Sequence, residues 1–86
     1  MEISYYDIID KTKIIDIRSK IDYDENNLGT INIPRLTLLS DPSMYLNKND
    51  EYYLLCDKGT VSFSCARILN ALGYKCYSIK GGIKGI

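Results

Sequence analysis

Residues 51–73 read EYYLLCDKGTVSFSCARILNALG, and this stretch decides the fold. The run EYYLLC is apolar and aromatic, which predicts a buried central strand. The loop CDKGTVS follows it. A helix is predicted from about Thr60 to Leu72, with Gly73 as its C-terminal cap. The apolar stripe expected on this helix comprises Val61, Cys65, Ile68 and Leu72.

The segments around this stretch alternate between strand and helix patterns. KIIDIRS, INIP and KCYSIK have the length and composition of strands. Ser4 is positioned to cap a short helix in YYDIID, and a helix broken at Pro42 is expected between Leu36 and Leu46. This alternation predicts an α/β fold in three layers, with a central, mainly parallel sheet flanked by helices on both faces. Residues 1–86 are expected to form a single domain.

Composition excludes several classes of function. The formal net charge is zero, whereas nucleic-acid-binding proteins usually carry a basic face. The chain contains no histidine, so no Cys-His or Ser-His mechanism can operate within it. No apolar run is long enough to cross a membrane.

The cysteines indicate neither a disulfide framework nor a metal site. There are three of them, with no C-x-x-C pair. The first residues, MEISYYDIID, have no basic region followed by an apolar run, so no signal peptide is expected. A cytoplasmic protein without metal or organic cofactor is the expectation.

The loop CDKGTVS predicts a reactive cysteine. In parallel sheets reactive groups gather beyond the carboxyl ends of the strands, where Cys56 lies. Gly59 permits a turn whose N–H groups face inward, and the following helix N-terminus adds a partial positive charge. Cys56 should therefore exist partly as the nucleophilic thiolate, without a separate base. The alternative for Cys56 is a cysteine buried in the core without a chemical role. For Cys65 and Cys76 that core role is the preferred interpretation.

The order of the motifs resembles the rhodanese-like sulfurtransferase family. The Asp-x-Arg end of IIDIRS, the segment GTINIP, the loop cysteine, glycine and serine, and the late Gly81-Gly82-Ile83 match the family pattern in order, over nearly the whole chain. The resemblance implies a rhodanese-like fold with Cys56 as the catalytic residue, and a structural role near the site for Asp16 and Arg18. The substrate-binding loop that it implies comprises Asp57, Lys58, Gly59, Thr60, Val61 and Ser62.

The loop departs from the family pattern where charge matters. Val61 occupies the position of the family's arginine, so a cation that would hold thiosulfate is absent. Lys58 can substitute only as a point charge, and Asp57 repels anions and disfavours the thiolate. The expected activity is transfer of sulfane sulfur through a Cys56 persulfide, with thiosulfate as a poor donor. The expected partners are a small sulfur donor and a thiol or protein acceptor, with no nucleic acid or membrane, and the chain is expected to be a monomer.

Two alternatives remain. One is a non-catalytic interaction or regulatory module on the same fold, favoured by the lost arginine and by Asp57. The other, a phosphatase or arsenate reductase, ranks low because such an enzyme needs an arginine at the position of Ser62, and the loop contains none.

Overall fold

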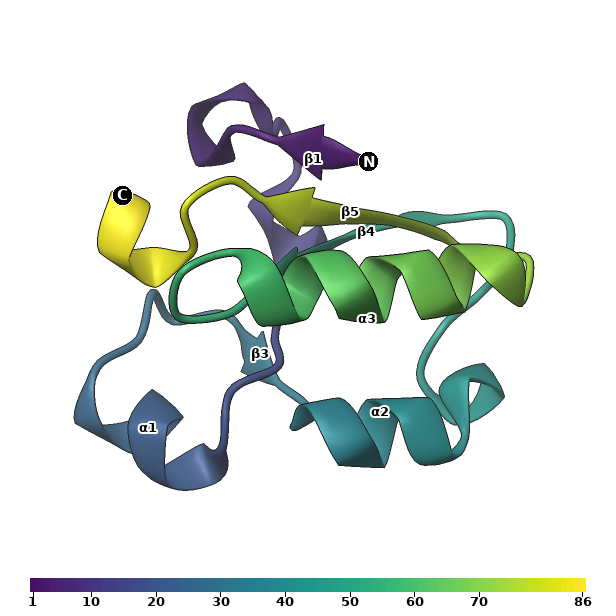
Figure 1. Cartoon of the computed structure of the whole chain (residues 1–86), viewed down its shortest axis with the longest axis horizontal. Coiled ribbons are helices and arrows are strands. Elements are labelled where there is room, and N and C mark those ends of the chain that lie inside the picture. Colours follow the sequence, from purple (N-terminus) through teal and green to yellow (C-terminus); the bar gives the residue numbers. More distant parts are fainter.

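The computed structural model, which describes residues 1–86, is built around a five-stranded sheet (Figure 1). The strand order is β1-β5-β4-β2-β3, and every pair of neighbours is parallel. The central strand, β4, continues directly into Cys56. The strands are β1 (Glu2–Ile3), β2 (Ile14–Asp16), β3 (Ile31–Asn32), β4 (Glu51–Leu55) and β5 (Lys75–Ile79). The predicted α/β fold with a parallel sheet is therefore confirmed.

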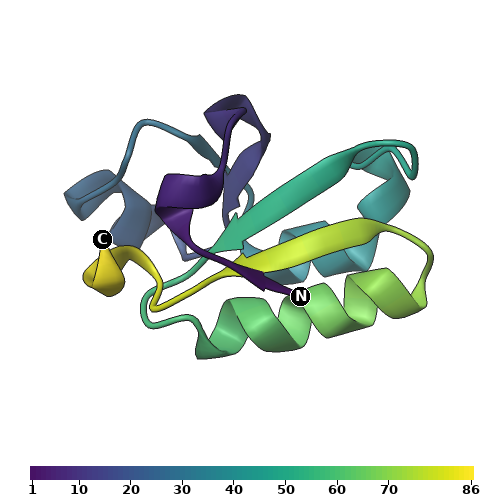
Figure 2. The ribbon, with the colours of Figure 1, turned by 90° about the horizontal axis from the view of Figure 1, so that it is seen from above.

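Helices cover the two faces of the sheet unequally. Figure 2 shows α2 and α3 side by side on one face and the amino-terminal turns on the other. The α-helices are α1 (Lys20–Glu25), α2 (Arg35–Ser40) and α3 (Thr60–Ala71). The 3-10 turns are η1 (Tyr5–Asp7), η2 (Lys11–Lys13), η3 (Pro42–Met44) and η4 (Ile83–Gly85). No helix has both the length and the apolar character that a membrane span requires.

The hydrophobic core is divided by the sheet because successive side chains of a strand point to opposite faces. On the face of α2 and α3, twelve buried residues form one cluster, which includes Leu54 and Cys56. On the other face only four are buried together, Leu55 among them. Both faces of β4 are thus covered, which explains its continuous apolar sequence.

The buried face of α3 differs from the expected stripe. Val61, Ile68 and Leu72 are about half exposed, and of the stripe only Cys65 is buried. The residues of α3 that face the sheet are Ser62, Cys65, Ala66 and Leu69. These side chains are mostly small, so the helix can lie close to the sheet, and the buried hydroxyl has hydrogen-bond partners there.

The amino-terminal segment also differs from the prediction. The expected helix in YYDIID is the single 3-10 turn η1, capped as expected by Ser4. The unexpected strand β1 pairs with β5, so that Glu2 lies beside Ser78. At Pro42 the predicted break does occur, because α2 ends at Ser40 and η3 begins at the proline.

Candidate active site

The loop after β4 turns the chain sharply into α3. Gly59 has a φ of 96°, a left-handed conformation that favours glycine. A Cβ atom there would lie 3.0 Å from the backbone nitrogen of Gly81. The turn brings the first N–H groups of α3 back toward the end of β4. Cys56 is the residue that lies in front of them.

The sulfur of Cys56 accepts two backbone hydrogen bonds. The N–H of Gly59 lies 3.1 Å from Sγ and that of Ser62 lies 3.2 Å from it. The thiol in turn donates to Oγ of Ser62 at 3.2 Å. Cys56 is only 3% exposed, so these dipoles act where little water competes with them. The positive ends of two backbone N–H dipoles are thus directed at the sulfur.

A chain of hydroxyl groups extends from the sulfur into the sheet. Oγ of Ser62 lies 2.6 Å from Oγ of Ser78 on β5. Each hydroxyl also lies within hydrogen-bond range of the carbonyl of Gly59, at 3.3 and 3.2 Å respectively. Both serines are fully buried. The sequence analysis did not single out Ser78; its only signal is a small polar residue in the apolar strand KCYSIK.

The segment after β5 packs against the back of the loop. The N–H of Ile83 donates to the carbonyl of Cys56 at 2.9 Å, and the N–H of Lys84 donates to that of Asp57 at 3.1 Å. A Cβ atom on Gly82 would lie 2.4 Å from the Asp57 carbonyl. The loop backbone is therefore fixed on one side by α3 and on the other by η4.

Charged side chains surround the loop without reaching the sulfur. The carboxylate of Asp57 pairs with Nζ of Lys84 at 3.2 Å, and both side chains are more than half exposed. The sequence analysis did not identify Lys84, which partly offsets the charge of Asp57. Lys58 and Thr60 are exposed, and Lys58 forms no ion pair. Val61 is 48% exposed and contributes no charge.

Asp16 and Arg18 form a buried ion pair at the end of β2. Asp16 is fully buried, and its Oδ2 lies 2.8 Å from Nη2 of Arg18. The hydrogen bond from the guanidinium to Asp16 raises the pKa of Arg18. Nη2 also donates to the carbonyl of Asn26 at 2.6 Å, which ties β2 to the segment after α1. A hollow of about 350 Å³ lies beside the loop and is lined by Arg18, Asp22, Glu25, Asn26, Asp57, Ile83 and Lys84.

The other two cysteines lie in the core. Cys65 is 1% exposed and Cys76 is 2% exposed, and neither forms a disulfide. Burial raises the pKa of Cys65 to about 11 and that of Cys76 to about 12. Both thiols are therefore protonated near neutral pH. No three His, Cys, Asp or Glu side chains are grouped so that they could hold a metal ion.

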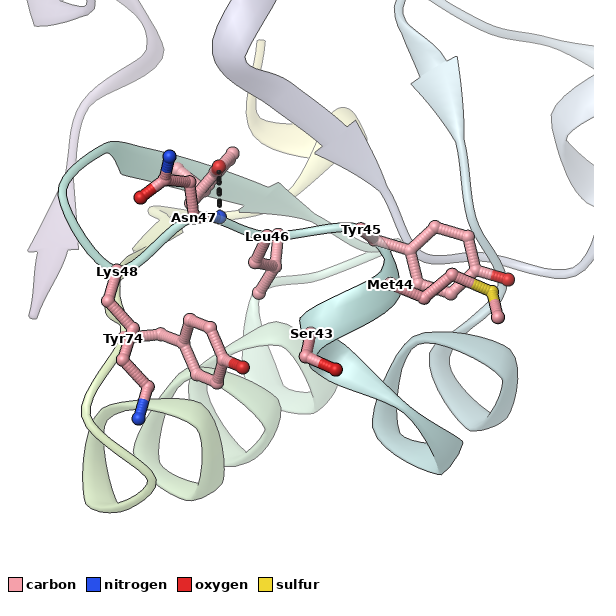
Figure 3. A pocket seen from close by; sticks show the side chains of 8 residues that line it. Ser43, Met44, Tyr45, Leu46, Asn47, Lys48 and Tyr74 are labelled. Carbon is pink, nitrogen blue, oxygen red and sulfur yellow. Dashed lines mark hydrogen bonds between the residues drawn. The ribbon is translucent and has the colours of Figure 1, made fainter.

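A larger hollow, of about 560 Å³, lies at the other end of the sheet (Figure 3). It is bounded by the segment before β4, by Tyr52 of β4 and by Tyr74, which immediately precedes β5. Two of its polar groups already have partners. The N–H of Asn47 donates to the Tyr52 hydroxyl at 2.7 Å, and the ammonium of Lys48 lies 5.3 Å from the centre of the Tyr74 ring. Because it adjoins the amino ends of β4 and β5, this hollow is remote from Cys56.

Comparison with known proteins gives one family. The family model described as "Rhodanese-like domain" matches residues 4–86. No curated protein has a sequence similar enough to match.

Three solved structures match the fold with TM-scores from 0.72 to 0.79. A rhodanese-related protein from Thermoplasma volcanium is 25% identical, with a TM-score of 0.79 over 93% of this chain and 80% of its own. A rhodanese-like domain protein from Staphylococcus aureus is 26% identical, with a TM-score of 0.76 over 85% of this chain and 72% of its own. A NAD-dependent persulfide reductase from A. fulgidus is 27% identical, with a TM-score of 0.72 over 95% of this chain but 15% of its own.

Proposed function

The chain belongs to the family of rhodanese-like domains, and from this premise we propose that it is a sulfurtransferase that carries sulfane sulfur on Cys56. In the first step the Cys56 thiolate attacks the outer sulfur of a donor such as a persulfide. The new S–S bond forms as the donor's own S–S bond breaks, and the donor leaves as a thiolate. In the second step an acceptor thiolate attacks the terminal sulfur and releases the Cys56 thiolate. No net oxidation occurs and no cofactor is consumed.

The observation that carries this proposal is the pair of N–H groups directed at Sγ. Those of Gly59 and Ser62 lie 3.1 and 3.2 Å from it. Fixed donors of this kind stabilise the thiolate before attack, because they do not have to reorient as the charge develops. These N–H groups stabilise the thiolate electrostatically in a chain that has no histidine to act as a base. The hydroxyl of Ser62 provides a third polar contact to the sulfur.

The surroundings of the sulfur favour a slender donor with little charge. Cys56 is 3% exposed, so only a narrow group, such as the terminal sulfur of a persulfide, can approach it. Thiosulfate is a dianion, whereas the loop has Val61 in place of an arginine and carries Asp57 at its surface. We therefore propose that persulfides are better donors than thiosulfate, and that the acceptor is a thiol, free or on a protein.

Intact-protein mass spectrometry after incubation with persulfide and thiosulfate donors tests the proposal. The wild-type protein should gain the mass of one sulfur atom, and Cys56→Ser should gain none. Cys76→Ser is the matched control, because this buried cysteine lies in the core and should not affect the gain. Retention of activity in a folded Cys56→Ser variant would show that the mechanism is wrong.

The same assay distinguishes the sulfurtransferase from the second candidate function, a non-catalytic interaction module. The absence of a loop arginine, marked by Val61, and the acidic Asp57 favour that candidate. Val61→Arg should increase thiosulfate turnover about tenfold or more if the loop is a substrate site, because a hydrogen bond to a charged group contributes about 2 kcal/mol. If the wild-type protein gains no sulfur from any donor, including a persulfide, the proposed function becomes that of a non-catalytic interaction module.

A further inference from the structure

We propose that Ser78 is a positioning residue for the reactive thiol, acting through Ser62, an inference that rests on the proposed function of Cys56. Ser78 does not touch the sulfur. Its hydroxyl lies 2.6 Å from that of Ser62, which in turn lies 3.2 Å from Sγ. Ser78 is fully buried in β5, a strand held between β1 and β4. Its oxygen is therefore fixed by the sheet rather than by a flexible loop.

Loss of the thiol proton changes what Ser62 must do. In the thiol form, the S–H group donates to Oγ of Ser62, and the Ser62 proton is directed to Ser78 or to the Gly59 carbonyl. When Cys56 gives its proton to solvent, the sulfur becomes an acceptor only. The Ser62 hydroxyl must then turn its proton toward the sulfur.

Ser78 lowers the free-energy cost of this reversal of the Ser62 hydroxyl. Either hydroxyl can be the donor across the 2.6 Å contact, so the bond can change direction without movement of the oxygens. In the thiolate form Ser78 donates to Oγ of Ser62 or to the carbonyl of Gly59, the acceptor that Ser62 has released. Without Ser78, one Ser62 proton has to serve both the sulfur and the Gly59 carbonyl. A chain of hydrogen bonds also polarises its members, which strengthens the bond to the anion.

The test is the pH dependence of Cys56 alkylation by iodoacetamide, followed by peptide mapping. Ser78→Ala should shift the Cys56 profile to higher pH and slow alkylation near neutral pH by about threefold to tenfold. Ser78→Thr, which keeps a hydroxyl, should restore the wild-type profile. Cys76→Ala removes a buried group from the same strand outside the hydroxyl chain and should leave the profile unchanged.

Several results would overturn the inference. One is a Ser78→Ala profile equal to that of the wild-type protein. Another is faster alkylation of Cys65 as well as a changed rate at Cys56, because general loosening of the core would then explain both. If Ser78→Ala does not fold, Ser78→Cys fills nearly the same space with a weaker donor. A smaller shift in the same direction supports the inference, and no shift refutes it.

The experiment also separates this inference from the proposed function. Alkylation needs no sulfur donor, so its pH profile can be measured even if sulfur transfer fails. A wild-type protein that accepts no sulfur would refute the proposed function while leaving the Ser78 effect on alkylation measurable. An unchanged alkylation profile together with normal sulfur transfer would refute only the role of Ser78.

Discussion

Replacement of Gly82 by alanine should detach the turn η4 from the Cys56 loop, residues 56–62. Gly82 has φ 62° and ψ −163°, a conformation that is open to essentially no residue but glycine. The added Cβ would lie 2.4 Å from the carbonyl carbon and oxygen of Asp57 and 2.6 Å from the carbonyl oxygen of Cys56. These contacts are backbone atoms, so no side-chain rotation can relieve the overlap. The two segments must move apart.

The energetic cost follows from these contacts. A strained backbone conformation of this kind costs about 1–3 kcal/mol. Separation also breaks the hydrogen bonds from Ile83 to Cys56 and from Lys84 to Asp57, each with a net contribution of about 1 kcal/mol. The expected loss is therefore about 3–5 kcal/mol, a large part of the roughly 4–13 kcal/mol expected for a domain of this length.

Gly29→Ala provides a matched control for backbone strain alone. Gly29 also has a positive φ, of 77°, but a Cβ atom there would meet nothing within 4 Å. Its replacement should cost only about 1 kcal/mol. Urea unfolding monitored by circular dichroism measures both free energies, and iodoacetamide mapping reports the state of the loop in each variant.

Equal free-energy losses in Gly82→Ala and Gly29→Ala would refute this reasoning, because the close contact would then contribute nothing. A large loss of stability with an unchanged alkylation rate at Cys56 in the folded protein would refute the link between η4 and the loop.

Three further predictions concern charge. Asp16→Ala should destabilise the fold by about 3–5 kcal/mol in urea unfolding, because it leaves the charge of Arg18 buried without its partner. The free energy of unfolding should fall as pH rises above about 9, because Cys65 and Cys76 stay protonated to about pH 11 and 12 in the folded state, whereas the unfolded thiols ionise earlier. Each of the two thiols lowers the free energy of unfolding by up to about 1.4 kcal/mol per pH unit. Cys76→Ala should therefore reduce the dependence of this free energy on pH, measured by unfolding at several pH values. Asp57→Asn should change stability by less than about 1 kcal/mol, because its ion pair is exposed, yet should increase thiosulfate turnover; an unchanged turnover would count against repulsion of the donor.

Local patterns predicted the elements that flank the Cys56 loop. The apolar run of β4 and the glycine at position 59 placed Cys56 at the end of a central parallel strand, as the structure shows. Strand β1 was not predicted because two residues carry almost no periodicity, and its partner β5 lies more than seventy positions away.

Other features depend on packing that periodicity does not describe. Of the predicted apolar stripe on α3 only Cys65 is buried, because the face that packs on the sheet is made of Leu69 and mostly small residues. The contact between Ser62 and Ser78 depends on the pairing of β5 with β4, which places Ser78 beside Leu54. Such a register is a tertiary property, so the sequence alone did not connect either Ser78 or Lys84 with the loop.

The pairing of β1 with β5 has a consequence for the order of events during synthesis. Residues 2 and 3 pair with residues 78 and 79, and the N–H groups of residues 83 and 84 donate to the carbonyls of Cys56 and Asp57. Translation delivers residues 78–84 after β1 and after the Cys56 loop, the two segments that they contact. While residues 78–84 are still inside the ribosome tunnel, β1 has no partner strand, and the loop at Cys56 lacks its hydrogen bonds from residues 83 and 84. We expect the Cys56 thiol to acquire its native environment only after residues 82–84 have emerged and packed against the loop.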